Sequence, residues 1–457
     1  MPADVSAQAR FERGIELHRA GQPAEALPWF AGAVEAEPRS AVYLNGLGIV
    51  LRVLRRLPEA IACYRRAIAL EPGFAVGYSN LGNALKDNLN VEEAIAAHRT
   101  AVDLAPRVPD FIYNLGIALA FAGRSEEALD CYEEALALNP GHVMLAWDRA
   151  RMLLQLGDYR RGWRAYEVRW KLPENPPRAF PEPHWNGRPY PDRRLLVHCE
   201  QGFGDTIQCA RFLPAVKALG GTLVVECQPS LIPLIERLPE VDEVVAKGAP
   251  LPPFDRHLSI LGLPRVFVES LAAVPASVPY LSPPPDRAAK FDKAMAAAGS
   301  RLKVGIVWSG STTFRLNWAR ATTIDRFLHH FALPEVLLYS LQKGPPEAEL
   351  APFRDDPRLI DLSPLIADFA DTAAAVERLD LVLMTDSAVA HLAGALARPV
   401  WVLLSFGSHW LWLNERDDSP WYPTMRFFRQ RTAGDWDEVF TRAAAALSQR
   451  ADSPRRD

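Results

Sequence analysis

Residues 109–140 have the sequence PDFIYNLGIALAFAGRSEEALDCYEEALALNP. Apolar residues recur at helical spacing in both halves of this stretch. Glu126 and Glu127 stand in the first turn of the second half, where the helix dipole favours negative charge. Pro140 follows the second half, and proline stops a helix from continuing. The stretch therefore predicts two consecutive helices.

The same pattern recurs through the first part of the chain with a period of 34 residues. The positions that repeat are Pro38, Pro72, Pro106 and Pro140; Gly14, Gly48, Gly82 and Gly116; Ala26, Ala60, Ala94 and Ala128; Ala33, Ala67, Ala101 and Ala135; and the rings of Phe30, Tyr64, His98 and Tyr132. We expect the small residues where two helices approach closely, and the rings in the gaps between neighbouring repeats. Helix pairs with a 34-residue period are typical of tetratricopeptide repeats, stacked scaffolds that bind other proteins.

A degenerate fifth repeat follows the four regular ones. Gly157 keeps the turn between its helices, but Gly162 and Arg169 stand where the series has alanine. The sequence RRGWRAYEVRW (160–170) is rich in aromatic residues, which favours docking onto the next domain; a solvated capping helix is the alternative. We predict a regular array over 1–142 and docking helices over 143–176.

Composition is that of an ordinary globular protein. The chain has 457 residues, enough for about three domains. Hydrophobic residues make up 49%, charged residues 23%, and the net charge is −4, so neither nucleic acid nor a membrane surface is a predicted partner. The sequence shows no signal peptide and no apolar run near ~18 residues, which predicts a cytoplasmic protein without a membrane span. Five cysteines without a CxxC pair predict reduced thiols.

The second half has a different pattern. Residues 171–194 hold seven prolines, so we predict an extended linker over 177–194. Short β-rich runs then alternate with helical stretches, which is typical of parallel, doubly wound sheets. We predict two Rossmann-like domains, 195–285 and 286–457. Ligands of such folds bind at the carboxyl ends of the strands, so we expect a site in a cleft between the two domains.

The turn after the first predicted strand, EQGFGDT (200–206), is the first candidate site. Its Gly-x-Gly pattern, with Glu226 further on, resembles a dinucleotide-binding turn. Ile207 replaces the third glycine, and Asp205 puts a carboxylate where a pyrophosphate would bind. Asp205 is then either a helix cap or a general base at the edge of the cleft.

Asp386, Ser387 and His391 form a second candidate site, where a predicted strand runs into a helix. Ser387 lies at the helix N-terminus, where backbone N–H groups and the dipole favour a phosphate. His391 is one turn further along the same face. The alternative is a capping residue followed by a buried histidine.

Further polar residues follow other predicted strands. Gln342 and Lys343 come after one strand, and Arg315 and Arg320 come after another. Loop cations are usually just solvated, but their shared position after parallel strands favours contact with a diphosphate.

Asp435-Trp436-Asp437 resembles an Asp-x-Asp metal site. Glu438 lies three residues after Asp435 and an amphipathic run follows, a pattern that indicates a helix start instead.

Five segments of the second half resemble those of a known family: GFGDTIQCARFLPAVKAL, SLQKG, DFADTAA, DLVLMTDSAVAHLAGALARPVWVLL and DSPWYPTMRFFRQ. With the repeats, the chain resembles bacterial tetratricopeptide-repeat glycosyltransferases with a GT-B catalytic region, related to O-GlcNAc transferases and heptosyltransferases. The resemblance implies an inverting, metal-independent transfer without a cofactor. It implies Asp205 as the base. The donor-binding residues that it implies are Gly204, Arg320, Gln342, Lys343, Asp386, Ser387 and His391.

The resemblance also implies the binding partners. We expect a nucleotide-sugar donor, such as a UDP-linked sugar, and a protein or peptide acceptor in the groove of the array, such as flagellin or another surface protein. The sequence differs from the family's pattern at two places. Ser387 stands where relatives have threonine, and the 314–320 loop is more apolar than theirs. A non-catalytic scaffold with a degenerate transferase domain is therefore the alternative, while an NAD enzyme fits only the Gly202, Gly204 and Glu226 pattern.

Overall fold

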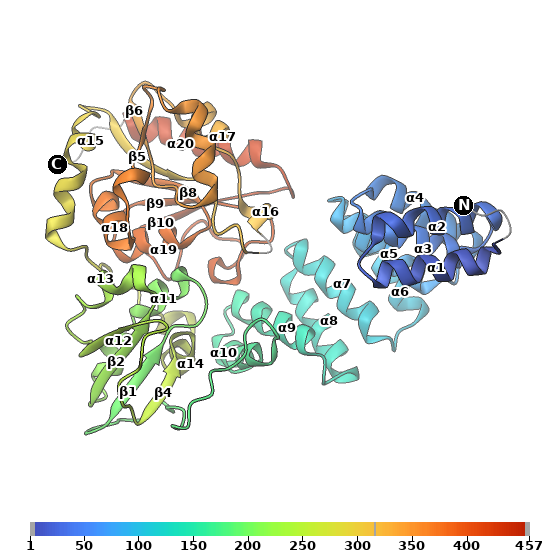
Figure 1. Cartoon of the computed structure of the whole chain (residues 1–457), viewed down its shortest axis with the longest axis horizontal. Helices are drawn as coiled ribbons and strands as arrows, with labels where there is room; N and C mark the ends of the chain where they lie inside the picture. The colour runs from blue at the N-terminus through green and yellow to red at the C-terminus, as the bar shows by residue number, and fades with distance from the viewer. Residues whose placement is uncertain (1–4, 315–316, 453–457) are drawn as a thin grey trace. The chain divides into compact units, whose positions relative to one another are not determined.

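The computed structural model describes residues 5–314 and 317–452, and Arg315 lies outside the described residues. The chain divides into two compact units (Figure 1). The first runs to Leu156 and also takes in Ala165–Pro176. The second holds Gly157–Arg164 and continues from Pro177. Each unit is described by itself.

The first unit is an array of paired helices, as the 34-residue period predicts. Its helices are α1 (Ala7–Arg19), α2 (Pro23–Ala36), α3 (Ala41–Val53), α4 (Leu57–Leu70), α5 (Ala75–Asp87), α6 (Val91–Leu104), α7 (Pro109–Phe121), α8 (Ser125–Leu138) and α9 (Val143–Gln155), followed by the 3-10 helix η1 (Tyr166–Lys171). Each helix packs on the next one along the chain, so successive pairs stack into one array.

The repeated small residues mark the close contacts between helices. All eight alanines of the two alanine registers are fully buried. A Cβ atom added at the repeated glycine would lie 2.6–3.0 Å from the repeated ring; the pairs are Gly14 with Phe30, Gly48 with Tyr64, Gly82 with His98 and Gly116 with Tyr132. Each ring therefore packs on the glycine of its own repeat, and this contact explains why both positions recur together.

The second unit contains two parallel sheets. The first has the order β3-β2-β1-β4 and the second the order β10-β9-β8-β5-β6-β7. The strands are β1 (Arg194–His198), β2 (Thr222–Cys227), β3 (Glu243–Ala246), β4 (Arg256–Ser259), β5 (Leu302–Val307), β6 (Val336–Ser340), β7 (Leu359–Asp361), β8 (Leu381–Thr385), β9 (Val400–Leu404) and β10 (Met425–Arg429). The predicted fold class is confirmed: a helical repeat array precedes two parallel-sheet α/β domains, consistent with a GT-B-like arrangement.

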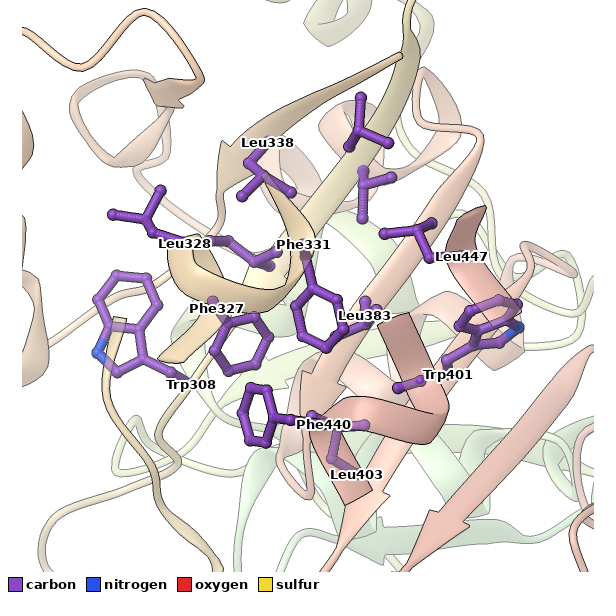
Figure 2. Packing of buried hydrophobic residues seen from close by; sticks show 14 of the residues in the cluster. Trp308, Phe327, Leu328, Phe331, Leu338, Leu383, Trp401, Leu403, Phe440 and Leu447 are labelled. Carbon is purple, nitrogen blue, oxygen red and sulfur yellow. The ribbon is translucent and has the colours of Figure 1, made fainter. Parts of the chain in front are cut away.

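Helices connect these strands. They are α11 (Phe203–Ala210), α12 (Leu213–Lys217), α13 (Ile232–Ile235), α14 (Leu263–Phe267), α15 (Asp292–Ala296), α16 (Asn317–Arg320), α17 (Ile324–Phe331), α18 (Phe369–Glu377), α19 (Ala388–Ala395) and α20 (Trp436–Asp452). Figure 2 shows Phe327 and Phe331 of α17 and Phe440 of α20 packed with strand residues such as Leu383 in one buried cluster. These two helices cover one face of the second sheet, and the central strands β8 and β9 are buried along their whole length.

Helix α10 (Tyr159–Ala165) shows where the aromatic residues of the fifth repeat go. Through Arg164 it belongs to the second unit. The ring of Tyr159 lies 6.0 Å from Trp421, and the ring of Trp163 lies 5.3 Å from Trp410. These two aromatic residues of the fifth repeat thus pack on aromatic residues near the C-terminus, within the second unit.

The described residues bear on two predictions from the sequence, the lack of a membrane span and the reduced cysteines. No helix in residues 5–314 and 317–452 has the length and apolar character needed to cross a membrane. None of the five cysteines, all of which lie in the described ranges, forms a disulfide.

Candidate functional site

The turn between β1 and α11 is held by a hydrogen bond to Asp205 of α11 and by hydrogen bonds from Gln228, which follows β2. Gly202 is the N-cap of α11, and its N–H donates to Asp205 Oδ2 over 2.8 Å. The amide of Gln228 donates to the carbonyl oxygens of Gln201 and Gly202, both over 3.2 Å. Asp205 is therefore not the N-cap itself; it is the third residue of α11, and its side chain caps the helix by accepting from the N-cap residue.

Asp205 has an unusual electrostatic environment. Burial is the main cause that raises the pKa of Asp205 to about 6, and the charges of Glu200 and Asp386 raise it further. Hydrogen bonds from backbone N–H groups oppose this change without cancelling it. A carboxylate that titrates near neutral pH is suited to general-base chemistry.

The second candidate site lies where β8 ends and α19 begins. Ser387 is the N-cap of α19, and its side chain makes no capping hydrogen bond in the described structure. Asp386 Oδ2 lies 3.7 Å from Arg320 Nη1. Burial raises the pKa of Asp386, whereas the charge of Arg320 lowers it. The start of α19 thus carries a hydroxyl, a carboxylate and a nearby guanidinium.

His391 joins the two candidate sites. A Cβ atom added at Gly204 would lie 2.9 Å from Cδ2 and 3.3 Å from Nε2 of His391, so α11 and α19 meet directly here. His391 Nδ1 lies 3.0 Å from the hydroxyl of Tyr422, and its ring stacks on Trp412 at 5.1 Å. Burial is the main cause that lowers the pKa of His391 to about 3. The structure therefore brings Gly204 and Asp205 close to Asp386, Ser387, His391 and Arg320.

The side chains of Gln342 and Lys343 form hydrogen bonds with backbone groups of the protein. Gln342 is buried; its oxygen accepts from the backbone N–H groups of Trp308 and Ser309 over 3.1 and 3.0 Å. Its amide donates to the carbonyl oxygen of Ser309 over 3.1 Å. Lys343 Nζ donates to the carbonyl oxygen of Ser363 over 3.0 Å. In this conformation both side chains brace the loops at the carboxyl ends of the second sheet.

The Asp-x-Asp segment forms a helix start, as Glu438 indicated. Asp435 Oδ1 accepts from the N–H of Glu438 over 3.1 Å, and Asp437 pairs with Arg326 over 2.5 Å. Within residues 5–314 and 317–452, no group of three or more His, Cys, Asp or Glu side chains is placed to hold a metal ion.

A buried polar network around Arg211 was not predicted from the sequence. Arg211 donates to the carbonyl oxygens of Pro275 and Trp421 over 2.9 and 2.6 Å, and to the hydroxyl of Tyr280 over 3.1 Å. Its guanidinium lies 4.5 Å from the ring centre of Tyr422. The neighbouring aromatic residues in DSPWYPTMRFFRQ could have indicated a buried cluster, but the sequence pattern does not show that Arg211 is their partner.

Comparison with known proteins identifies tetratricopeptide repeats in the first unit and one protein of similar sequence. Models of the tetratricopeptide repeat match residues 109–142, and TPR repeat models match residues 54–88. Protein FlbA from Caulobacter vibrioides is 32% identical over 337 residues, a match that covers 66% of this chain and 55% of FlbA. The chain thus spans about half the length of this relative. The match is longer than the repeat region, so it includes part of the α/β region.

Solved structures with partial likeness match about a third of the chain. MamA from Desulfovibrio magneticus RS-1 has 21% identity and a TM-score of 0.32, covering 36% of this chain and 92% of MamA. Pseudomonas aeruginosa pilF has 24% identity and a TM-score of 0.34, covering 35% of this chain and 74% of pilF. The fold itself rests on the repeats and sheets described above: residues 54–88 and 109–142 match tetratricopeptide repeats, an α/β region follows the array, and the chain is similar to FlbA.

Proposed function

We propose that the chain is a glycosyltransferase that moves a sugar from a nucleotide-sugar donor to a protein acceptor recruited by the repeat array. One observation carries the proposal. The turn with Asp205 meets the start of α19, which carries Asp386, Ser387 and His391, at the ends of parallel strands. A base therefore lies next to a helix N-terminus that suits a phosphate.

The proposed reaction is a single displacement with inversion. Asp205 accepts the proton of the acceptor hydroxyl as its oxygen bonds to the anomeric carbon of the sugar. The bond from that carbon to the diphosphate breaks, and the nucleoside diphosphate leaves with the electron pair. The N–H groups at the start of α19 and the guanidinium of Arg320 stabilise the charge that develops on the diphosphate. Gln342 and Lys343 then act through the loops that they brace.

The domain assignment belongs to this proposal. The array over 1–142 and the helices over 143–176 recruit the acceptor, and the linker covers 177–194. The domain over 195–285 supplies Asp205, and the domain over 286–457 binds the donor. A polypeptide such as flagellin or another surface protein is the proposed acceptor, because repeats of this type suggest protein binding.

Asp205→Asn tests the proposed base. The amide oxygen of asparagine can still accept from Gly202, so the helix start is kept while the proton acceptor is lost. We expect sugar transfer to fall by a factor of about 10² to 10⁴, the usual contribution of a general base, with donor binding unchanged. Asp435→Asn is the matched control, because Asp435 also accepts a backbone N–H at a helix start. Unimpaired transfer by Asp205→Asn contradicts the assignment.

The pH dependence of transfer gives a second test. Because the pKa of Asp205 is raised to about 6, the base is protonated, and transfer falls, as the pH drops below about 6. Asp386→Asn removes a charge that raises this pKa, so the acid limb of its residual activity should move to lower pH. An acid limb near the usual aspartate pKa of about 4 contradicts a raised pKa.

The alternative function is a non-catalytic scaffold with a degenerate transferase domain. The observation that favours it is that Lys343 already has protein partners where a donor phosphate would bind. Its Nζ atom donates to the carbonyl oxygen of Ser363 and lies 3.5 Å from a carboxylate oxygen of Glu347. A thermal-shift screen against a panel of nucleotide sugars separates the two functions. Stabilisation by one of them supports the transferase, and no stabilisation by any of them favours the scaffold.

A further inference from the structure

The hydroxyl of Tyr422 lies between His391 and a second phenol, which is half-buried. It is 3.0 Å from His391 Nδ1 and 3.5 Å from the hydroxyl of Tyr280. Tyr422 is fully buried, and its ring fills the space beside Gly394, where an added Cβ atom would lie 2.3 Å away. The ring therefore has one position, and its single proton has two possible acceptors.

The neighbouring groups decide which acceptor receives this proton. The hydroxyl of Tyr280 donates to the carbonyl oxygen of Ile207 over 3.0 Å, and a carbonyl oxygen can only accept. Arg211 Nη2 donates to the same hydroxyl over 3.1 Å, and a guanidinium can only donate. The proton of Tyr280 is thus already used. The proton of Tyr422 goes to the nearer acceptor, His391 Nδ1, because 3.0 Å is a normal hydrogen-bond length and 3.5 Å is long.

We propose that Tyr422 is a positioning residue that holds His391 as a neutral imidazole with its proton on Nε2, directed at the turn that carries Asp205. An imidazole that accepts a hydrogen bond at Nδ1 and is neutral must carry its proton on Nε2. This inference rests on the proposed function only in naming the ligand: an oxygen that accepts a hydrogen bond, such as a phosphate oxygen of the donor.

Two ring contacts and two nearby charges hold the ring in this state. Trp412 stacks on one face of His391, and the Nε2 edge lies against Gly204. The charges of Arg211 and Arg320 oppose a second proton on the ring. Arg211 also holds the segment that carries Tyr422, because it donates to the carbonyl oxygen of Trp421 over 2.6 Å. A neutral donor in a fixed position needs no reorganisation when a phosphate oxygen arrives.

The tautomer can be measured by ¹⁵N NMR of the full-length protein labelled on histidine, without any donor. Loss of one set of signals in His391→Gln identifies those of His391. We expect a protonated Nε2 and an unprotonated Nδ1 that accepts a hydrogen bond. In Tyr422→Phe the Nδ1 signal should shift to that of a nitrogen without a donor. A protonated Nδ1 in the wild-type protein, or an Nδ1 signal unchanged in Tyr422→Phe, overturns the proposal.

Tyr339→Phe is the matched control. Tyr339 is also fully buried, and its hydroxyl donates to the carbonyl oxygen of Ala294 over 3.1 Å, away from His391. This variant should leave the His391 signals unchanged, so a general loosening of the fold can be distinguished from loss of the Tyr422 hydrogen bond. A shift of these signals in Tyr339→Phe equal to that in Tyr422→Phe also overturns the proposal.

The functional consequence is measured with the nucleotide sugar that gives the largest thermal shift in the panel described above. We expect Tyr422→Phe to weaken its binding by about tenfold relative to Tyr339→Phe, the size of one hydrogen bond. Equal binding by the two variants contradicts a positioning role. Should no nucleotide sugar bind, the proposed function fails, whereas the tautomer measured without donor still decides the state of His391.

Discussion

His98 gives the first unit a pH dependence that a single substitution should remove. It occupies the register where the other regular repeats have Phe30, Tyr64 and Tyr132, and it packs fully buried on Gly82. Neither ring nitrogen has a hydrogen-bond partner within the described residues. Burial is the main cause that lowers the pKa of His98 from 6.5 to about 4, and the charges of Lys86 and Arg52 lower it further.

The sign of the effect follows from the direction of this change. The unfolded chain binds a proton at His98 below about pH 6.5, whereas the folded chain does so only below about pH 4. The contribution of His98 to the free energy of unfolding is therefore intact above about pH 6.5 and is lost as the pH falls. Each pKa unit corresponds to about 1.4 kcal/mol, so the full loss is about 3 kcal/mol, of which about 2 kcal/mol is lost by about pH 5.

His98→Phe introduces the ring that repeat one already has at this register, against a glycine that leaves room for it. Urea unfolding of the full-length protein, followed by far-ultraviolet circular dichroism, gives the free energy of unfolding at about pH 7.5 and about pH 5. We expect the stability advantage of His98→Phe over the wild type to increase by about 2 kcal/mol at the lower pH. This double difference cancels every other titrating group.

His329→Gln is the control, because it removes an exposed imidazole from the second unit. It should keep the pH dependence of the wild type. The reasoning is refuted by a His98→Phe advantage that is the same at both pH values, since His98 would then bind a proton equally well in the folded and unfolded chain.

Two further predictions concern stability, one for each unit. Gly48→Ala places a methyl group 2.6 Å from the buried ring of Tyr64 and should destabilise the array by about 1–3 kcal/mol, whereas Gly73→Ala, with no atom within 4 Å, should change its urea midpoint little. Tyr159→Phe removes the acceptor of a 3.1 Å hydrogen bond from Trp421 Nε1 and leaves that buried N–H unpaired, so the second unit should lose about 1–3 kcal/mol of stability. A thermal or urea transition of this unit unchanged in Tyr159→Phe would show that the bond contributes nothing.

The fold was predictable because the contacts that specify it repeat in the sequence. Gly48 and Tyr64 lie sixteen residues apart, and each of the other three regular repeats has a glycine and a ring at the same separation. The alternation of strands and helices likewise predicts parallel sheets without knowledge of any particular contact. Asp435 was correctly interpreted as a helix start because its partner, the N–H of Glu438, is three residues away.

The polar contacts of the candidate site were not predictable in the same way. The carbonyl oxygen that Arg211 bonds belongs to Trp421, 210 residues further along the chain. Gln342 follows a strand, as expected of a ligand-binding side chain. Its partners, however, are backbone groups of Trp308 and Ser309 at the end of β5. The Arg211 contact depends on how the two sheets meet, and the Gln342 contacts depend on the pairing of β5 with β6. No local period encodes either arrangement.

The proposed reaction gives different roles to two carboxylates that lie near the contact of α11 with α19. Asp386 has Arg320 as a counterion at 3.7 Å, so its negative charge is compensated, although burial raises its pKa. Asp205 is held by the N–H of Gly202 and is repelled by Glu200 and Asp386. Two titratable groups whose environments differ in this way divide the work between them. In the proposed reaction Asp386 orients Arg320, and Asp205 accepts the proton.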